Sequence, residues 1–232
     1  MDIPYIIVAG GKGLRMGANI PKQYIEIKGK PLIYYTISNL VKAGVKRFII
    51  VIDMQYQEYL KKHLENFKVS IQYANGGKER YESVLNGINC LNKEDDYVAI
   101  HDSVRPLVSK NMVEVLAQGI INNDISGIVP ILPVKDTVKL VKDGMVDKTI
   151  DRANIRRVGT PQLVKVKDYL EAIKNIGDKL KLATDDASIL EMNGSFVGVM
   201  EGDEEAFKIT DSMDLALFEF LLGRQNENWN RL

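Results

Sequence analysis

Glycines and basic residues gather directly after the first apolar run of the chain, and together these residue types can bind an anion such as a phosphate. The segment reads Ala9-Gly10-Gly11-Lys12-Gly13-Leu14-Arg15-Met16-Gly17, and Lys22 follows shortly after it. Glycines let backbone N–H groups approach and surround an anion, and the lysine and arginine side chains add positive charge. We therefore interpret the segment as a phosphate-binding loop. The alternative is a plain glycine turn with solvated lysines.

This glycine segment does not fit two familiar phosphate loops. The P-loop ends in Gly-Lys followed by Ser or Thr, but Leu14 and Arg15 follow Gly13. The dinucleotide-binding pattern needs a glycine where Met16 stands. It also needs an acidic residue about 20 positions further on, and Asp53 is too far away to serve. An NAD-binding dehydrogenase is therefore excluded.

A single aspartate, Asp102, offers a metal ligand at the end of another apolar run. Mg²⁺ prefers one or two carboxylates together with phosphate oxygens and water, so Asp102 is well placed to hold it beside a nucleotide. The alternative is an aspartate that only caps its loop. We interpret the neighbouring His101 as a packing residue and Cys90 as core filler.

The elements that would position these residues alternate between strands and helices. Apolar runs, typical of strands covered on both faces, are found at residues 4–9, 47–52 and 97–100, and residues 69–73 are interpreted as a further strand. Helical spacing of apolar residues is found at residues 31–43, 55–66, 80–91 and 111–122. This alternation predicts right-handed crossovers and a mostly parallel sheet, in which ligands bind at the carboxyl ends of the strands.

The pattern changes in the second half of the chain. Residues 127–133, 137–141 and 146–150 are β-prone and close together, and Lys142-Asp143-Gly144 supplies a turn between the last two. Helical patterns return at residues 165–175, 185–192 and 212–222, with a short strand at 196–200 and a polar tail, expected to be frayed, from Gly223 onward. We predict one α/β domain over residues 1–232, with a Rossmann-like, mostly parallel sheet flanked by helices and a β-hairpin arm inserted at about residues 134–158.

Composition narrows the class of protein. The 31 basic residues balance 31 acidic ones, which argues against a nucleic-acid-binding protein, and 45% hydrophobic residues are typical of a globular chain. One cysteine excludes a disulfide framework, and two histidines argue against a zinc site. No apolar run approaches the roughly 18–20 residues that span a bilayer, and the N-terminus lacks the features of a secretory signal. We therefore expect a cytoplasmic protein with no membrane partner.

With further motifs added, the sequence resembles the 2-C-methyl-D-erythritol 4-phosphate cytidylyltransferase family, which belongs to the nucleotidyltransferases that activate sugars and polyol phosphates. The resemblance extends from near Tyr5 to near Leu222. Besides the glycine segment, it rests on Pro21-Lys22-Gln23-Tyr24, residues 76–84, residues 101–106, residues 133–137, Asp151-Arg152, Thr160-Pro161-Gln162, residues 184–188 and Phe207-Lys208-Ile209-Thr210. It implies a fold of the nucleotide-diphospho-sugar transferase type.

The resemblance implies transfer of CMP from CTP to 2-C-methyl-D-erythritol 4-phosphate, with release of pyrophosphate, in non-mevalonate isoprenoid biosynthesis. The attacking group would be a phosphate oxygen. Because a phosphate monoester is mostly dianionic at pH 7, no general base and no covalent nucleophile are required. Catalysis then depends on positioning two anions and neutralising their charge with arginine, lysine and Mg²⁺.

The resemblance also implies roles for individual residues. Those implied in catalysis are Arg15, Lys22, Arg152 and Lys208. Those implied in CTP binding are Ala9, Gly10, Gly11, Gly13, Gly76, Gly77, Arg80 and Ser83. Those implied in binding the acceptor phosphate are Asp102, Arg105, Thr137, Arg152, Thr160, Thr184 and Lys208, and Asp102 would also hold Mg²⁺. Ser83 has an alternative as an ordinary residue of a helix's first turn, and Lys12 one as a solvated lysine.

The arm and Lys208 carry two further expectations. Arg152 and Thr160 belong to the arm region, which in this family reaches a second subunit, so the resemblance implies a homodimer with composite sites. A projecting hairpin has unpaired edges, and their burial against a partner makes physical sense. Lys208 interrupts an apolar strand pattern, and a buried lysine is costly without an anion, so we expect it to be functional.

Two departures from the family pattern leave an alternative acceptor open. Many family members have Ala-Ala-Gly where this chain has Ala9-Gly10-Gly11, and Ala-Ala where it has Ser103-Val104. Both differences bring the chain near the ribitol 5-phosphate cytidylyltransferases of wall and capsule polymers. Asp151-Arg152 favours methylerythritol phosphate instead. A catalytically inactive relative with a binding or assembly role is the second alternative, and the presence of the loop cations and of Asp102 argues against it.

Overall fold

The computed structural model describes residues 2–11 and 20–229, with side chains described as far as Arg224. Residues 12–17 of the predicted phosphate-binding loop, among them Lys12, Gly13 and Arg15, lie outside the described residues. The rest of the predicted site falls within them.

The central sheet is mostly parallel, as predicted. Its strands are β1 (Tyr5–Val8), β4 (Arg47–Ile52), β5 (Ser70–Asn75), β6 (Tyr97–Asp102), β7 (Gly127–Pro133), β10 (Arg156–Val158), β11 (Gln162–Lys165) and β12 (Val197–Glu201). They follow the order β10-β7-β11-β6-β1-β4-β5, with β12 also paired to β7. β1 pairs in parallel with β4 and β6, whereas β10 and β11 run antiparallel to β7. Neither β10 nor β11 was predicted.

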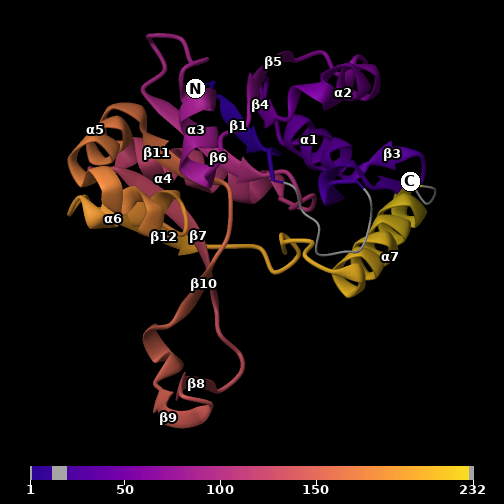
Figure 1. The fold of residues 1–232 in the computed structure, drawn as a ribbon. Helices are drawn as coiled ribbons and strands as arrows, with labels where there is room; N and C mark the ends of the chain where they lie inside the picture. Colours follow the sequence, from indigo (N-terminus) through magenta and orange to yellow (C-terminus); the bar gives the residue numbers. More distant parts are fainter. Residues whose placement is uncertain (1, 12–19, 230–232) are drawn as a thin grey trace.

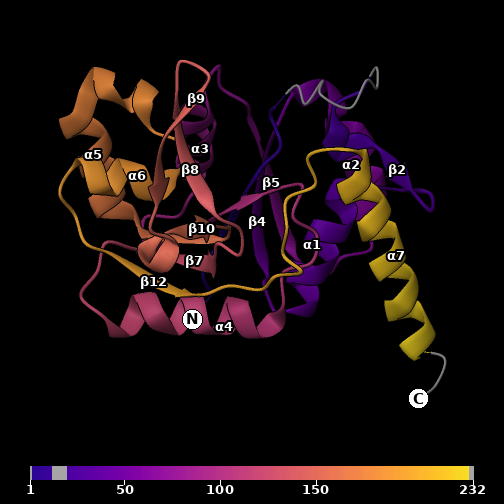
Figure 2. The ribbon, with the colours of Figure 1, turned by 90° about the horizontal axis from the view of Figure 1, so that it is seen from below.

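Helices cover both faces of the sheet. On one side lie α1 (Leu32–Lys42), α2 (Gln57–Leu64) and α4 (Lys110–Asn122), and on the other α3 (Arg80–Ile88), α5 (Val166–Ile176) and α6 (Asp186–Met192). The last helix, α7 (Ser212–Trp229), lies beside α1 at one edge (Figures 1 and 2). Smaller elements are β2 (Glu26–Ile27), β3 (Lys30–Pro31), and the 3-10 turns η2 (Lys22–Tyr24), η3 (Met54–Tyr56), η4 (Arg152–Asn154) and η5 (Gly177–Leu182). Within the described ranges, no helix has the length and apolar character needed to cross a membrane.

The central strand β1 is apolar throughout because both of its faces are buried. Ile6 packs into the cluster that contains Val84 of α3, whereas Ile7 packs into the opposite cluster with Ile37 of α1. Fully burying an aliphatic side chain of this size stabilises the fold by about 1.5–3 kcal/mol. Strand β1 is therefore packed firmly on both faces, and the loop that follows it at the carboxyl edge of the sheet starts from a fixed position.

The arm is a separate two-stranded sheet. It consists of β8 (Val138–Lys142) and β9 (Met145–Ile150), and it projects away from the central sheet (Figure 1). Asp143 and Gly144 in its turn both have positive φ, 51° and 77°, as a tight hairpin turn requires. Apolar side chains on the arm are open to solvent, with Met145 72% and Val146 61% exposed.

The C-terminal tail differs from the expectation. A frayed tail was predicted from Gly223 onward, but α7 continues to Trp229. Gly223 has open space around it, and Arg224 and the glutamine and glutamate that follow are good helix formers. The helix therefore continues through the glycine.

Candidate active site

A cavity of about 720 Å³ lies at the carboxyl ends of β1 and β6, beside the start of α3. Most of the residues predicted to bind CTP line it, together with predicted catalytic and metal-binding residues. The predicted residues among its lining are Ala9, Gly10, Gly11, Lys22, Gly76, Gly77, Arg80, Ser83, Asp102 and Lys208. Segments from five separate parts of the sequence therefore meet at the edge where the topology predicts a ligand site.

The glycine loops after β1 and β5 touch each other across the cavity. A Cβ at Gly10 would lie 3.1 Å from the Cα of Gly76, so neither loop has room for a side chain at this contact. Ser83 fixes the second loop, because its Oγ accepts the N–H of Gly77 at 2.9 Å. Ser83 thus lies in the first turn of α3 and at the cavity at the same time.

Gln23 fixes the first glycine loop, a role that was missed in the sequence. Its buried side-chain amide donates to the carbonyl of Ala9 at 2.7 Å and to that of Gly11 at 3.0 Å. The adjacent Lys22 donates through Nζ to the carbonyl of Ile209 at 3.0 Å. The segment after the glycine loop therefore connects that loop to the late segment that carries Lys208.

Asp102, at the end of β6, is surrounded by described cationic side chains. Its Oδ2 lies 2.9 Å from Lys208 Nζ and 3.4 Å from Arg105 Nε, and its Oδ1 lies 3.9 Å from Arg80 Nη2. Burial acts to raise the pKa of Asp102, but the charges of Lys208, Arg80 and Arg105 outweigh it and hold the pKa well below its ordinary value. Asp102 is therefore a carboxylate at neutral pH.

Lys208 is placed differently from the expectation. It lies in a loop rather than in a strand, and its side chain is 43% exposed. Phe207 and Ile209 on either side pack into a small apolar cluster with α7, which explains why the segment resembles a strand in sequence. The anion that was expected beside Lys208 is present as Asp102.

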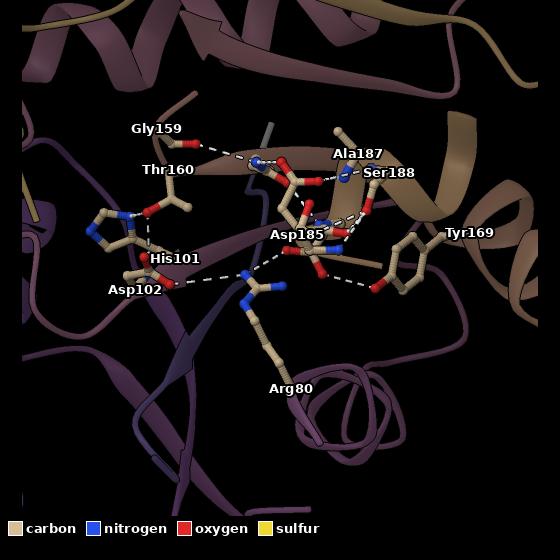
Figure 3. A network of polar contacts seen from close by, with 12 residues as sticks. Arg80, His101, Asp102, Gly159, Thr160, Tyr169, Asp185, Ala187 and Ser188 are labelled. Carbon is tan, nitrogen blue, oxygen red and sulfur yellow. Dashed lines mark hydrogen bonds and ion pairs between the residues drawn. The ribbon is translucent and has the colours of Figure 1, made fainter. Parts of the chain in front are cut away.

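Arg80 extends from the first turn of α3 (Figure 3) to a second carboxylate, that of Asp186. Arg80 Nη2 lies 2.7 Å from Asp186 Oδ2, and the fully buried Asp186 also accepts the hydroxyl of Tyr169 at 2.8 Å. Burial, and then Asp186 itself, raises the pKa of Tyr169 well above its ordinary value, so the phenol remains a donor. Neither Asp186 nor Tyr169 was predicted as a site residue. The run Thr184-Asp185-Asp186 was the available signal.

Thr160 and His101 form a short chain of hydrogen bonds to the backbone of Asp102. Thr160 Oγ1 accepts the backbone N–H of Asp102 at 3.1 Å and lies 2.9 Å from His101 Nδ1. His101 Nε2 lies 3.1 Å from the carbonyl of Arg105, which assigns the proton of a neutral imidazole to Nε2. Burial lowers the pKa of His101 to about 4. His101 is therefore a buried structural residue, as predicted, and Thr160 is buried beside β11 rather than in the arm region.

The remaining predicted acceptor residues do not line the cavity in the single chain. Arg105 is mostly buried and donates to the carbonyl of Ala206 at 3.0 Å. Thr137 is exposed at the base of the arm, and Arg152 donates to the carbonyl of Lys135 there. Thr184 is exposed before α6, and its backbone N–H donates to Ser188 Oγ at 3.1 Å.

A metal ion at this site would depend on a nucleotide. The described residues include no group of three or more His, Cys, Asp or Glu side chains arranged to hold a metal. Asp102 Oδ2 pairs with Lys208 and Arg105, whereas Oδ1 lies 3.9 Å from Arg80 Nη2. Asp102 lines the cavity, and a single carboxylate there fits Mg²⁺, which takes its other ligands from phosphates and water.

The sequence matches the IspD family, described as 2-C-methyl-D-erythritol 4-phosphate cytidylyltransferase, over residues 3–224. An enzyme of that name from Clostridium perfringens is 38% identical over 223 residues, covering 92% of this chain and 96% of the relative. One from Vibrio atlanticus is 33% identical and covers 96% of each chain. Among solved structures, the Francisella tularensis enzyme of the same name superposes with a TM-score of 0.79 at 27% identity, covering 94% of this chain and 99% of the other.

Proposed function

Because the chain belongs to the IspD family of 2-C-methyl-D-erythritol 4-phosphate cytidylyltransferases, we propose that the cavity at the carboxyl ends of β1 and β6 is its active site. The enzyme transfers a cytidylyl group from CTP to 2-C-methyl-D-erythritol 4-phosphate, a step of isoprenoid biosynthesis. The observation that carries the assignment to this cavity is the meeting of two glycine loops with Lys22, Arg80, Asp102 and Lys208 around it.

The reaction joins two anions without proton transfer. An oxygen of the acceptor phosphate attacks the α-phosphorus of CTP, the new P–O bond forms, and the bond to the β-phosphate breaks to release pyrophosphate. The acceptor phosphate is mostly dianionic at pH 7 and already nucleophilic. The side chains around the cavity fit this chemistry, since they include several cations, and the described histidine nearest to it, His101, is buried and neutral.

The cations divide into two groups by position. We assign Lys22, which follows the first glycine loop, to the phosphates of CTP, and Lys208 to the incoming acceptor phosphate, because both line the cavity. Arg15 would add charge at the α-phosphate, but it lies outside the described residues. A preorganised cation that stabilises developing charge contributes on the order of 10²–10³ in rate.

Asp102 is the residue that would hold Mg²⁺. With CTP bound, the metal would neutralise phosphate charge. The variant Asp102→Asn should bind Mn²⁺ in the presence of CTP much more weakly than the wild type, as measured by electron paramagnetic resonance. The surface variant Asp124→Asn is a matched control, because the Asp124 side chain is fully exposed.

We further propose that the arm joins two chains and completes each site. Met145, Val146 and Val141 on the arm are all more than half exposed, and this apolar surface becomes buried if the arm packs on a partner. Thr137 and Arg152 lie away from the cavity in their own chain, so a partner's cavity is where they would meet the acceptor. CTP and the phosphorylated acceptor are intracellular metabolites, which supports a cytoplasmic location.

The decisive experiment supplies the purified protein with CTP, Mg²⁺ and either 2-C-methyl-D-erythritol 4-phosphate or ribitol 5-phosphate. Pyrophosphate release and the mass of the product are measured. The names of the relatives favour the first acceptor, so we expect turnover with it and little with ribitol 5-phosphate. Turnover of ribitol 5-phosphate alone would reverse the choice of acceptor. No turnover with either would leave the inactive, binding-protein alternative.

A further inference from the structure

Arg80 is held at the cavity by a carboxylate that lies outside it. Asp186 Oδ2 is 2.7 Å from Arg80 Nη2, and the side chain of Asp186 is 0% exposed. Arg80 is 31% exposed and lines the cavity, while Asp186 is absent from the cavity lining. A buried carboxylate is unfavourable unless it is paired, so this ion pair fixes the direction in which Arg80 points.

The surroundings of Asp186 are arranged to hold its carboxylate in one orientation. Tyr169 donates its hydroxyl to Oδ1, which leaves Oδ2 for Arg80. The backbone is held as well, because Gln162 Oε1 accepts the N–H groups of Asp186 and Ala187, each at 3.0 Å. Tyr169 of α5 (Figure 3) thus holds the side chain of Asp186, and Gln162 of β11 holds its backbone, although Asp186 itself does not line the cavity.

The same guanidinium nitrogen faces a competing carboxylate. Arg80 Nη2 lies 3.9 Å from Asp102 Oδ1. If Asp186 lost its charge, attraction would draw Arg80 toward Asp102. That movement would withdraw Arg80 from its present position at the cavity, which it lines together with Ser83 and the second glycine loop.

We propose that Asp186 is a positioning residue for CTP binding, which holds Arg80 against the nucleotide and away from Asp102. This inference rests on the proposed function of the cavity. Asp186 contacts neither substrate and acts through Arg80, with Tyr169 and Gln162 as its supports.

The test compares Asp186→Asn with Asp124→Asn. Asn is the same size as Asp, so Asp186→Asn removes the charge and little volume. The control removes the same charge from a fully exposed side chain that pairs with Lys165 and does not line the cavity. We expect Asp186→Asn to raise the KM for CTP about tenfold or more, with kcat within about threefold of wild type, because a charge-assisted contact is lost from binding rather than from chemistry. Asp124→Asn should keep the wild-type KM, and Tyr169→Phe should raise it by a smaller factor.

The split between KM and kcat separates positioning from mere stability. A variant that only unfolds more easily contains less active enzyme, so its apparent kcat falls while its KM stays the same. That result, or equal KM values for the two Asn variants, would overturn the inference.

A crystal structure of Asp186→Asn gives an answer that does not depend on turnover. Arg80 should be displaced toward Asp102, and a guanidinium in its original place would contradict the inference even in an enzyme with no activity. Failure of the wild type to transfer cytidylyl groups would instead contradict the proposed function.

Discussion

Lys208 Nζ lies 2.9 Å from Asp102 Oδ2, so a loop late in the chain places its cation on the carboxylate at the end of the central strand β6. Ile209 packs in an apolar cluster with Phe218 of α7, and Lys22 Nζ bonds the Ile209 carbonyl. The loop that carries Lys208 is thereby fastened to the body of the protein on either side of its exposed side chain.

Lys208→Gln should lose activity without losing stability. The substitution removes a cation that we assign to the acceptor phosphate, so we expect kcat to fall by about 10²–10³-fold. The side chain is 43% exposed and its ion pair is partly solvated, so the melting temperature should change by only a few degrees. Steady-state kinetics and circular dichroism melts measure the two effects. Lys110→Gln, which removes a surface lysine paired with Glu114, is the control and should resemble wild type. Wild-type kcat in Lys208→Gln would refute the assignment.

Stability should fall as the pH drops from 6.5 toward 4 because of His101. Burial lowers the pKa of folded His101 to about 4 from an ordinary 6.5, so within this window the unfolded chain binds more protons than the folded one. The contribution is fully present above pH 6.5 and decreases as the pH falls, by up to about 3 kcal/mol. Urea unfolding at a series of pH values measures it.

His101→Gln supplies the comparison for that pH series. Glutamine keeps a donor and an acceptor for Arg105 and Thr160 but does not titrate, so the slope between pH 6.5 and 4 should become shallower. The depressed pKa of Asp102 stabilises the fold above the ordinary aspartate pKa, and its contribution decreases only at lower pH. An unchanged slope in His101→Gln would show that other groups cause the dependence.

The parts of the fold that were predicted depend on local patterns. The runs of Tyr5–Val8 and Arg47–Ile52 are apolar at successive positions because helices cover both faces of the sheet, and that pattern is visible in a sequence. β10 and β11 were missed because they are short and begin with polar residues, Arg156 and Gln162. Their strand geometry comes from pairing with β7, which no local pattern reports.

In the candidate site, too, some residues were predicted from the sequence and some contacts were missed. Asp102 was predicted because it directly follows a strand at the carboxyl edge of the sheet, where ligands bind, and Gly76 was predicted from the family resemblance. The contacts of Asp186 with Arg80 and Tyr169 were missed because they join side chains from three separate helices. The position of Arg152 could not be predicted for another reason. The resemblance assigns Arg152 to the acceptor, but in its own chain Arg152 donates to the carbonyl of Lys135 at the base of the arm.

Gly77→Ala should weaken CTP binding. A Cβ at Gly77 would lie 2.3 Å from the Cβ of Glu82 and 2.9 Å from the backbone of Ser83, so the loop must move away from α3. We expect the KM for CTP to rise by about tenfold or more, because the loop would lose its bond to Ser83 and its place at the cavity. Gly223→Ala is the control: it lies in α7 with open space around it and should be as stable as wild type or slightly more so. A wild-type KM in Gly77→Ala would contradict the placement of this loop.

Mixing two inactive variants tests whether the arm completes the partner's site. Arg152→Ala is changed in the arm region and Lys208→Ala at the cavity, and each should be nearly inactive alone. If Arg152 serves the partner, a hybrid dimer has one site with both residues intact and one with neither. Random exchange, for example by co-expression with different tags, should then restore about a quarter of the wild-type activity, since half of the dimers are hybrids with one working site. If Arg152 serves its own chain, every site in the mixture lacks one residue and no activity returns.

The variant Met145→Asp tests whether the arm is the dimer interface. It places a charge at a position of the arm where the side chain is 72% exposed in the single chain, so sedimentation should show that the dimer dissociates. A Met145→Asp variant that remains dimeric would indicate that the arm is not the interface.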